Sequence, residues 1–150
     1  MRPFIGLVIV LFALMGCKED PNAPYLEFAG GGFIFNYRNA EAFYGFVAKP
    51  LRSLPEGSVI EAQFEVPNSS EPYVVTEAVK PGVLQFMFRT SDLRGIEKGH
   101  PYKAVMRLLA SPSGPELARY EKTFHTDVEQ ASLPDKPLVV GPGYQPNPNP

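Results

Sequence analysis

The chain has 150 residues, with 14 basic and 16 acidic side chains and a formal net charge of −2. The two signs of charge are interspersed without a run of lysine or arginine, which argues against nucleic acid as a partner, because phosphate binding needs a basic stripe. It argues equally against a second, electrostatic contact with a membrane. The length predicts one domain that can bury a self-sufficient core.

An uncharged apolar run extends from Phe4 to Met15, behind the basic residue Arg2. The run fits the hydrophobic region of a secretory signal peptide, about 7–15 residues long. It is too short for a membrane-spanning helix, which needs about 20 residues. The run closes on Leu14-Met15-Gly16-Cys17, and Cys17 is the only cysteine of the chain. An ordinary cleaved signal peptide and a short uncleaved anchor are the alternative interpretations.

The tetrapeptide 14–17 resembles the lipobox of bacterial lipoproteins, in which an aliphatic, a variable and a small residue precede an obligatory cysteine. This resemblance implies cleavage between Gly16 and Cys17, and a lipid-modified Cys17 as the mature N-terminus. The acyl chains that the family carries would hold the protein at a membrane, whereas one chain alone binds only reversibly. Lys18 stands where the family's inner-membrane retention signal has aspartate. By resemblance, we expect the periplasmic face of the outer membrane.

The expected organisation follows from this processing. Residues 1–16 are a signal peptide and residues 17–24 the lipidated N-terminus and linker. Residues 25–127 form the folded domain, and residues 128–150 a Pro-rich extended tail. Once Cys17 is acylated no thiol remains for a disulfide, so the domain must fold through burial alone.

Short strand patterns separated by proline and glycine fill the domain, and no segment after the leader shows a helical period. The clearest is 59–66, where apolar and polar residues alternate as in a half-solvated antiparallel strand. The predicted strands are 25–28, 33–37, 42–48, 59–66, 73–79, 83–90, 103–110 and 116–126. About seven or eight such strands predict an all-β antiparallel sandwich or barrel.

Gly30-Gly31-Gly32 interrupts the first strand patterns. A triple glycine in such a place predicts a bulge, a sharp bend or the close approach of another backbone. A phosphate-binding loop is disfavoured, because Phe33 and Ile34 follow where that loop needs Lys-Ser or Lys-Thr and a helix.

Ile96, Gly99 and Tyr102 precede one of the alternating strands. Their spacing resembles the tyrosine corner of immunoglobulin-like and fibronectin type III domains, in which the tyrosine hydroxyl bonds back to the backbone of the corner. The resemblance implies a single immunoglobulin-like sandwich. The chain departs from the antibody pattern, with Ala104 in place of a cysteine and no tryptophan. A lipocalin-like barrel is the alternative.

No pattern predicts an enzyme. His100 and His125 are the only histidines and lack metal-ligand spacing, and no Gly-x-Ser-x-Gly nucleophile motif occurs. The alternation explains Glu61 and Glu65 as a solvated face. We therefore expect no catalytic residue, no metal site and no cofactor other than the lipid on Cys17.

Candidates for partner binding come from apolar residues that the core does not require. Both faces of 42–48 are apolar apart from Gly45, so one face could remain exposed as a binding patch. Tyr44 and Phe46 share a face and are the candidates there, with a place in the core as the simpler interpretation. The tail offers Tyr144, on a disordered segment or on a semi-rigid polyproline arm. Leu138 to Val140 could add an edge strand, at home or on a neighbour.

These features favour a non-enzymatic, lipid-anchored envelope lipoprotein that binds or scaffolds an envelope protein. The alternative is a periplasmic small-ligand-binding lipoprotein, and a hydrolase or inhibitor accessory ranks last. A closed apolar cavity of several hundred Å³ would favour the ligand-binding alternative. A filled core with an exposed aromatic strip would favour protein binding.

Overall fold

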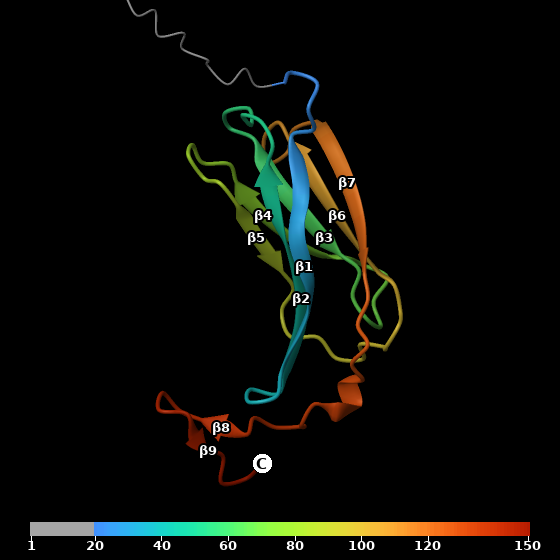
Figure 1. Ribbon diagram of the computed structural model, residues 1–150, viewed down its shortest axis with the longest axis vertical. Helices are drawn as coiled ribbons and strands as arrows, with labels where there is room; N and C mark the ends of the chain where they lie inside the picture. The colour runs from blue at the N-terminus through green and yellow to red at the C-terminus, as the bar shows by residue number, and fades with distance from the viewer. Residues whose placement is uncertain (1–19) are drawn as a thin grey trace, which may run out of the picture.

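The computed structural model describes residues 20–150, so the signal peptide, Gly16 and Cys17 lie outside the described residues. Two antiparallel sheets face one another, and a small hairpin lies at the C-terminal end (Figure 1). The all-β antiparallel sandwich predicted from the sequence is confirmed. The two sheets are separate, which excludes the lipocalin-like closed barrel. From residue 20 onward no helix has the length and apolar character to cross a bilayer.

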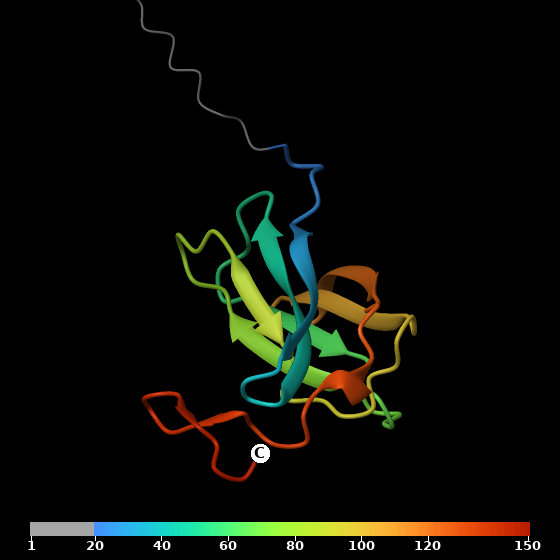
Figure 2. The same cartoon turned by 60° about the horizontal axis from the view of Figure 1, so that its bottom comes forward.

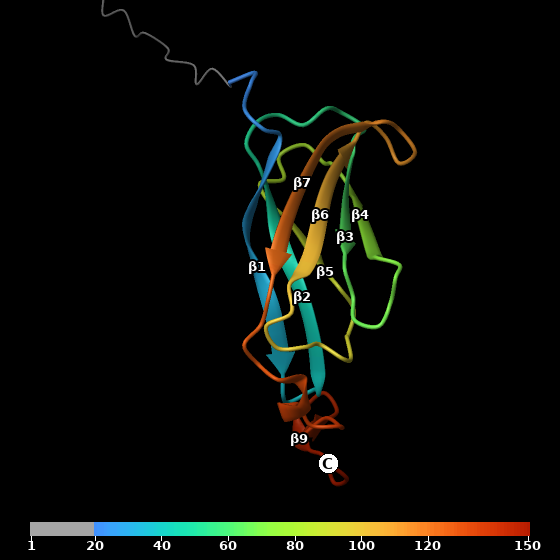
Figure 3. The ribbon, with the colours of Figure 1, turned by 90° about the vertical axis from the view of Figure 1, so that its right-hand side faces the viewer.

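Sheet A has three strands in the order β1-β2-β5 and sheet B has four in the order β4-β3-β6-β7. The strands of sheet A are β1 (Leu26–Asn36), β2 (Glu41–Pro50) and β5 (Phe86–Arg89). Those of sheet B are β3 (Val59–Phe64), β4 (Tyr73–Ala78), β6 (Tyr102–Leu109) and β7 (Glu116–Phe124). The chain changes sheet after β2, after β4 and after β5, which places the two layers face to face (Figures 2 and 3).

The two strands predicted around the triple glycine are one continuous strand, β1. Its register with β2 shifts between Phe28 and Gly30, which marks a bulge. At Gly31 the neighbouring backbone comes very close: a Cβ there would lie 2.5 Å from the carbonyl oxygen of Gly45 and 2.9 Å from the Cα of Phe46. The prediction of a bulge or a close backbone approach is confirmed, and both occur.

Aromatic rings from both sheets fill the space between them. The ring of Tyr44 stacks on Phe33, with centroids 4.6 Å apart, and meets Phe64 edge-on at 5.2 Å. The ring of Phe46 lies 5.3 Å from Phe64 and 5.6 Å from Phe88. The two contacts with Phe64 join sheet A to sheet B, so apolar burial binds the two layers together.

The corner before β6 contains the hydrogen bond expected of a tyrosine corner. The backbone N–H of Glu97 donates to the hydroxyl of Tyr102 at 2.9 Å, and Tyr102 is buried. Gly99 has φ +74°, a conformation that glycine adopts without steric cost. The corner is therefore fixed by its own side chain.

The prolines of the C-terminal segment predict an extended tail, but the structure shows a 3₁₀ turn and a short hairpin there. A 3₁₀ turn, η1 (Gln130–Ser132), docks on the loop before β6, where the side chain of Gln130 accepts from the N–H of Ile96 and donates to the carbonyl of Leu93. The short strands β8 (Val139–Val140) and β9 (Gln145–Pro146) then form a hairpin. These long-range bonds pull the tail back toward the domain.

Candidate functional site

Tyr44 and Phe46 lie in the core, at 0% and 2% exposure, and this corrects the prediction that they form a partner-binding patch. The Tyr44 hydroxyl donates to the backbone carbonyl of Glu65 at 2.6 Å, a bond that crosses from sheet A to sheet B. Burial, reinforced by the nearby Glu65 and Tyr102, raises the pKa of Tyr44. Both side chains therefore help to hold the two sheets together.

The opposite face of β2 is the one that points outward. Successive residues of a strand alternate between faces, so Phe43, Gly45 and Val47 lie on the outside of sheet A. Ile34 of β1 and Met87 of β5 join them, with exposures of 52% and 74%. We call this surface the apolar face; it consists of Gly32, Ile34, Phe43, Gly45, Val47 and Met87.

A trough runs across the apolar face, perpendicular to the strands. Its floor is backbone, because Gly32 of β1 is the cross-strand neighbour of Gly45 of β2. The pair Ile34 and Phe43 forms one wall. The pair Val47 and Met87 forms the other. The resulting open hollow has a volume of about 330 Å³.

The two glycines of the trough floor differ in whether a side chain would fit at their positions. A Cβ at Gly45 would lie 2.3 Å from the carbonyl oxygen of Phe88, so the close approach of β5 excludes any side chain. A Cβ at Gly32 would meet nothing within 4 Å, so the space above it is open. The trough is therefore a real gap in the side-chain layer of sheet A.

Arg89 stands at the β5 end of the trough, next to Gly45 in the register. Its guanidinium carbon lies 4.6 Å from the centroid of Phe43, in a cation–π contact. Within residues 20–150 no carboxylate forms an ion pair with Arg89, whereas Lys49 on the same face pairs with Glu27 at 3.2 Å. The trough thus combines apolar walls with an available cation.

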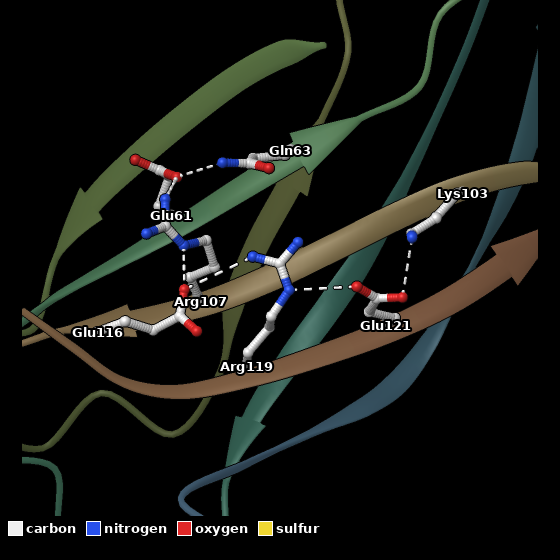
Figure 4. A network of polar contacts seen from close by, with 7 residues as sticks. All are labelled: Glu61, Gln63, Lys103, Arg107, Glu116, Arg119 and Glu121. Atoms are coloured by element: carbon white, nitrogen blue, oxygen red, sulfur yellow. Dashed lines mark hydrogen bonds and ion pairs between the residues drawn. The ribbon is translucent and has the colours of Figure 1, made fainter.

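The outer face of sheet B is different, because its charges neutralise one another (Figure 4). Arg107 pairs with Glu61 at 2.7 Å and with Glu116 at 2.5 Å. Glu121 forms ion pairs with Lys103 at 2.9 Å and with Arg119 at 3.2 Å. Glu61 is therefore part of a half-buried network rather than simply solvated.

The same network lowers the pKa of two carboxylates. The pKa of Glu116 lies below its ordinary value because Arg107 donates a hydrogen bond to it. Lys103, followed by Arg119, lowers the pKa of Glu121 in the same way. Each of the two carboxylates is paired with two cations, so this face offers few unsatisfied charges to a partner.

The remaining predicted residues lie apart from the apolar face. His100 approaches Glu65 at 3.5 Å and packs edge-on against Tyr102. Among the described residues no group of three or more His, Cys, Asp or Glu side chains could hold a metal ion. Tyr144, 61% exposed, lies on the β8–β9 turn with the guanidinium carbon of Arg38 4.7 Å from its ring centroid. The β8–β9 hairpin that carries it lies at the far end of the molecule from residue 20 (Figure 1).

Sequence reasoning missed Ile34, Met87 and Arg89 as site residues. One signal was available: Gly45 shares its face with Phe43 and Val47, and a face that contains a glycine fills a core less well than one made of tyrosine and phenylalanine. Comparison with protein-family models, curated proteins and solved structures finds no match. The site is therefore interpreted from its own geometry.

Proposed function

We propose that this protein is a non-enzymatic lipoprotein of the cell envelope, anchored through a lipid on Cys17, whose immunoglobulin-like sandwich binds another envelope protein through the apolar face. The observation that supports binding at this face is the open trough with Arg89 at its end. Contiguous exposed apolar patches with a polar rim are characteristic of interaction sites. The Leu14-to-Cys17 motif behind an apolar leader supports the anchor, and Lys18 after the cysteine supports the outer-membrane location.

The trough defines the chemistry of the partner. An aliphatic or aromatic side chain would contact the walls and lie against the glycine floor. Met87 can adjust to its shape, because methionine is flexible and polarisable. A carboxylate next to that side chain would pair with Arg89, whose planar guanidinium suits two parallel hydrogen bonds. The partner is therefore a protein segment that presents an apolar residue beside an acidic one.

A small-ligand-binding lipoprotein is the second candidate. Its support is an open hollow of about 630 Å³ between the β2–β3 and β4–β5 loops, a size within the roughly 300–1,000 Å³ of ligand pockets. The hollow lies at the end of the domain where the described chain begins, rather than between the sheets. Rings occupy the space between the sheets, which favours protein binding.

Photocrosslinking in intact cells tests the proposed face. A photoreactive residue at Met87 should capture one stoichiometric envelope protein, because this side chain stands in solvent. The matched control is the same probe at Val74, an exposed apolar residue on the outer side of sheet B. Capture from both positions alike, or from neither, would refute the assignment.

Charge reversal then tests the chemistry. Arg89→Glu should lower the crosslinking yield from position 87, and an acid-to-lysine change in the captured protein should restore it. The anchor has its own test: Cys17→Ser should remove both lipid incorporation and membrane fractionation. A Cys17→Ser protein that still fractionates with membranes at its original size would refute the anchor.

A further inference from the structure

The first described residues form a turn that is fastened to the domain. Asp20 and Ala23 close the turn, with the Ala23 N–H donating to the Asp20 carbonyl at 3.1 Å. Arg52, on the loop after β2, donates to the carbonyl of Pro21 at 2.6 Å, and its guanidinium carbon lies 3.6 Å from the ring centroid of Tyr25. Residues 20–25 are thus docked on the sandwich where the domain begins.

Two further bonds hold Tyr25 from both sheets. Its carbonyl accepts from the N–H of Leu51, and its N–H donates to the hydroxyl of Tyr120 on β7. The start of the domain therefore has a defined position relative to the strands.

Chain length then limits the distance to the membrane. Only four peptide units separate Pro21 from Cys17, and they span at most ~14 Å when fully extended. If the lipid is on Cys17, as the proposed function holds, this end of the sandwich must lie next to the bilayer. Three loops share this end, namely 51–58, 79–85 and 110–115, because β2, β4 and β6 end there and β3, β5 and β7 begin there.

These loops carry exposed leucines and two cations, of which Lys80 is exposed and Arg52 is partly buried. Leu84 is 81% exposed, and Leu51 on the neighbouring loop is also exposed. Lys80 and Arg52 line the hollow between the two loops. An exposed leucine gains from burial at the boundary between headgroups and acyl chains, and long cationic side chains can extend their charge toward phosphates.

We propose that this end of the sandwich is a membrane-contacting surface. The occupant of the hollow is the phospholipid of the anchoring bilayer, with Leu84 inserted at the headgroup boundary and Lys80 at the phosphates. Such a contact would be too weak to bind a free protein. The tether makes it intramolecular, so that the effective lipid concentration is high and few contacts suffice. The strands then stand upright on the membrane and the apolar face points sideways.

The test uses the full mature lipoprotein reconstituted in vesicles of phosphatidylethanolamine and phosphatidylglycerol. With Cys17 acylated, Leu84→Cys provides the single reactive thiol for an environment-sensitive nitrobenzoxadiazole label. The matched control is Leu138→Cys, an exposed leucine beside the turn between β1 and β2 at the opposite end. Contact with the bilayer should shift the emission at position 84 to the blue, and nitroxide-headgroup lipids should quench it several-fold more than at position 138.

The outcomes separate the orientation from the anchor. Equal quenching at both positions would mean that the domain lies flat on the membrane. Absence of quenching at position 84, in a protein that floats with the vesicles, would mean that this end does not contact the membrane. Either result overturns this proposal and leaves the anchor intact. Failure of the unlabelled protein to float would overturn the anchor, and the orientation with it. Arg52→Ala, which removes the bond to Pro21 and the contact with the Tyr25 ring, should reduce the quenching at position 84 without loss of flotation.

Discussion

Alanine at Gly31 should remove a large part of the stability of the sandwich, while alanine at the adjacent Gly30 should not. A Cβ at Gly31 would lie 2.5 Å from a backbone carbonyl and 2.9 Å from the Phe124 ring. The φ of +156° is also one that residues with a side chain rarely adopt. Overpacking costs about 1–3 kcal/mol and such a backbone conformation about 1–3 kcal/mol, so we expect a loss of roughly 4 kcal/mol.

This loss is large against a total stability of about 5–15 kcal/mol. With a urea slope of about 2 kcal/mol per molar, the midpoint of Gly31→Ala should fall by ~2 M. Gly30 has an ordinary φ and open space at its Cβ position, so Gly30→Ala should stay within about 0.5 kcal/mol of the unmodified protein. Urea unfolding of the chain from Lys18 onward, followed by circular dichroism, measures both. Equal midpoints for the two variants would refute the close-approach argument.

Three further predictions concern the corner, the two sides of sheet A and the charged network. Tyr102→Phe leaves a corner N–H without its acceptor and should cost about 1–2 kcal/mol in urea unfolding; an unchanged midpoint would show that water replaces the bond. Phe46→Ala should cost about 3–5 kcal/mol, whereas the outward Met87→Ala should change stability by less than about 0.5 kcal/mol, and similar losses would contradict the assignment of faces. The pKa values of Glu116 and Glu121 are lower in the folded protein than their ordinary value of 4.5, so their stabilising contribution is complete above that pH and is lost as pH falls through the folded values. Thermal melting between pH 7 and 3 should therefore show a shallower acid slope when both are changed to glutamine, and an unchanged slope would mean that the network contributes nothing.

The sequence predicted faces correctly where one side of a strand is polar. In β3 the inward positions Ile60, Ala62 and Phe64 follow directly from the alternation, and all three are buried. In β2 both sides are apolar, so local sequence does not encode which side is inward. The pairing of β2 with β1 and β5 decides it, and a shift of one residue exchanges the two faces completely. For this reason the sequence allows Tyr44 either on the surface or in the core, and the structure places it in the core.

The trough and the folded tail depend on contacts between distant parts of the chain. Gly32 and Gly45 make a common floor only because their strands pair, and Arg89 reaches it from a strand about forty residues further on. The tail is held by Gln130, which bonds to residues about 35 positions earlier. Local proline spacing predicts a backbone preference but carries no information about such partners.

The pairing of β1 with β2 over ten registered positions has a mechanical consequence. β1 starts at the end of the sandwich where residue 20 lies and reaches the turn on which the C-terminal hairpin rests, so tension between the two ends of the chain acts parallel to the strands. Such a load shears the rungs of the ladder simultaneously instead of peeling them one after another. Pulling on single molecules from the two ends would measure that resistance.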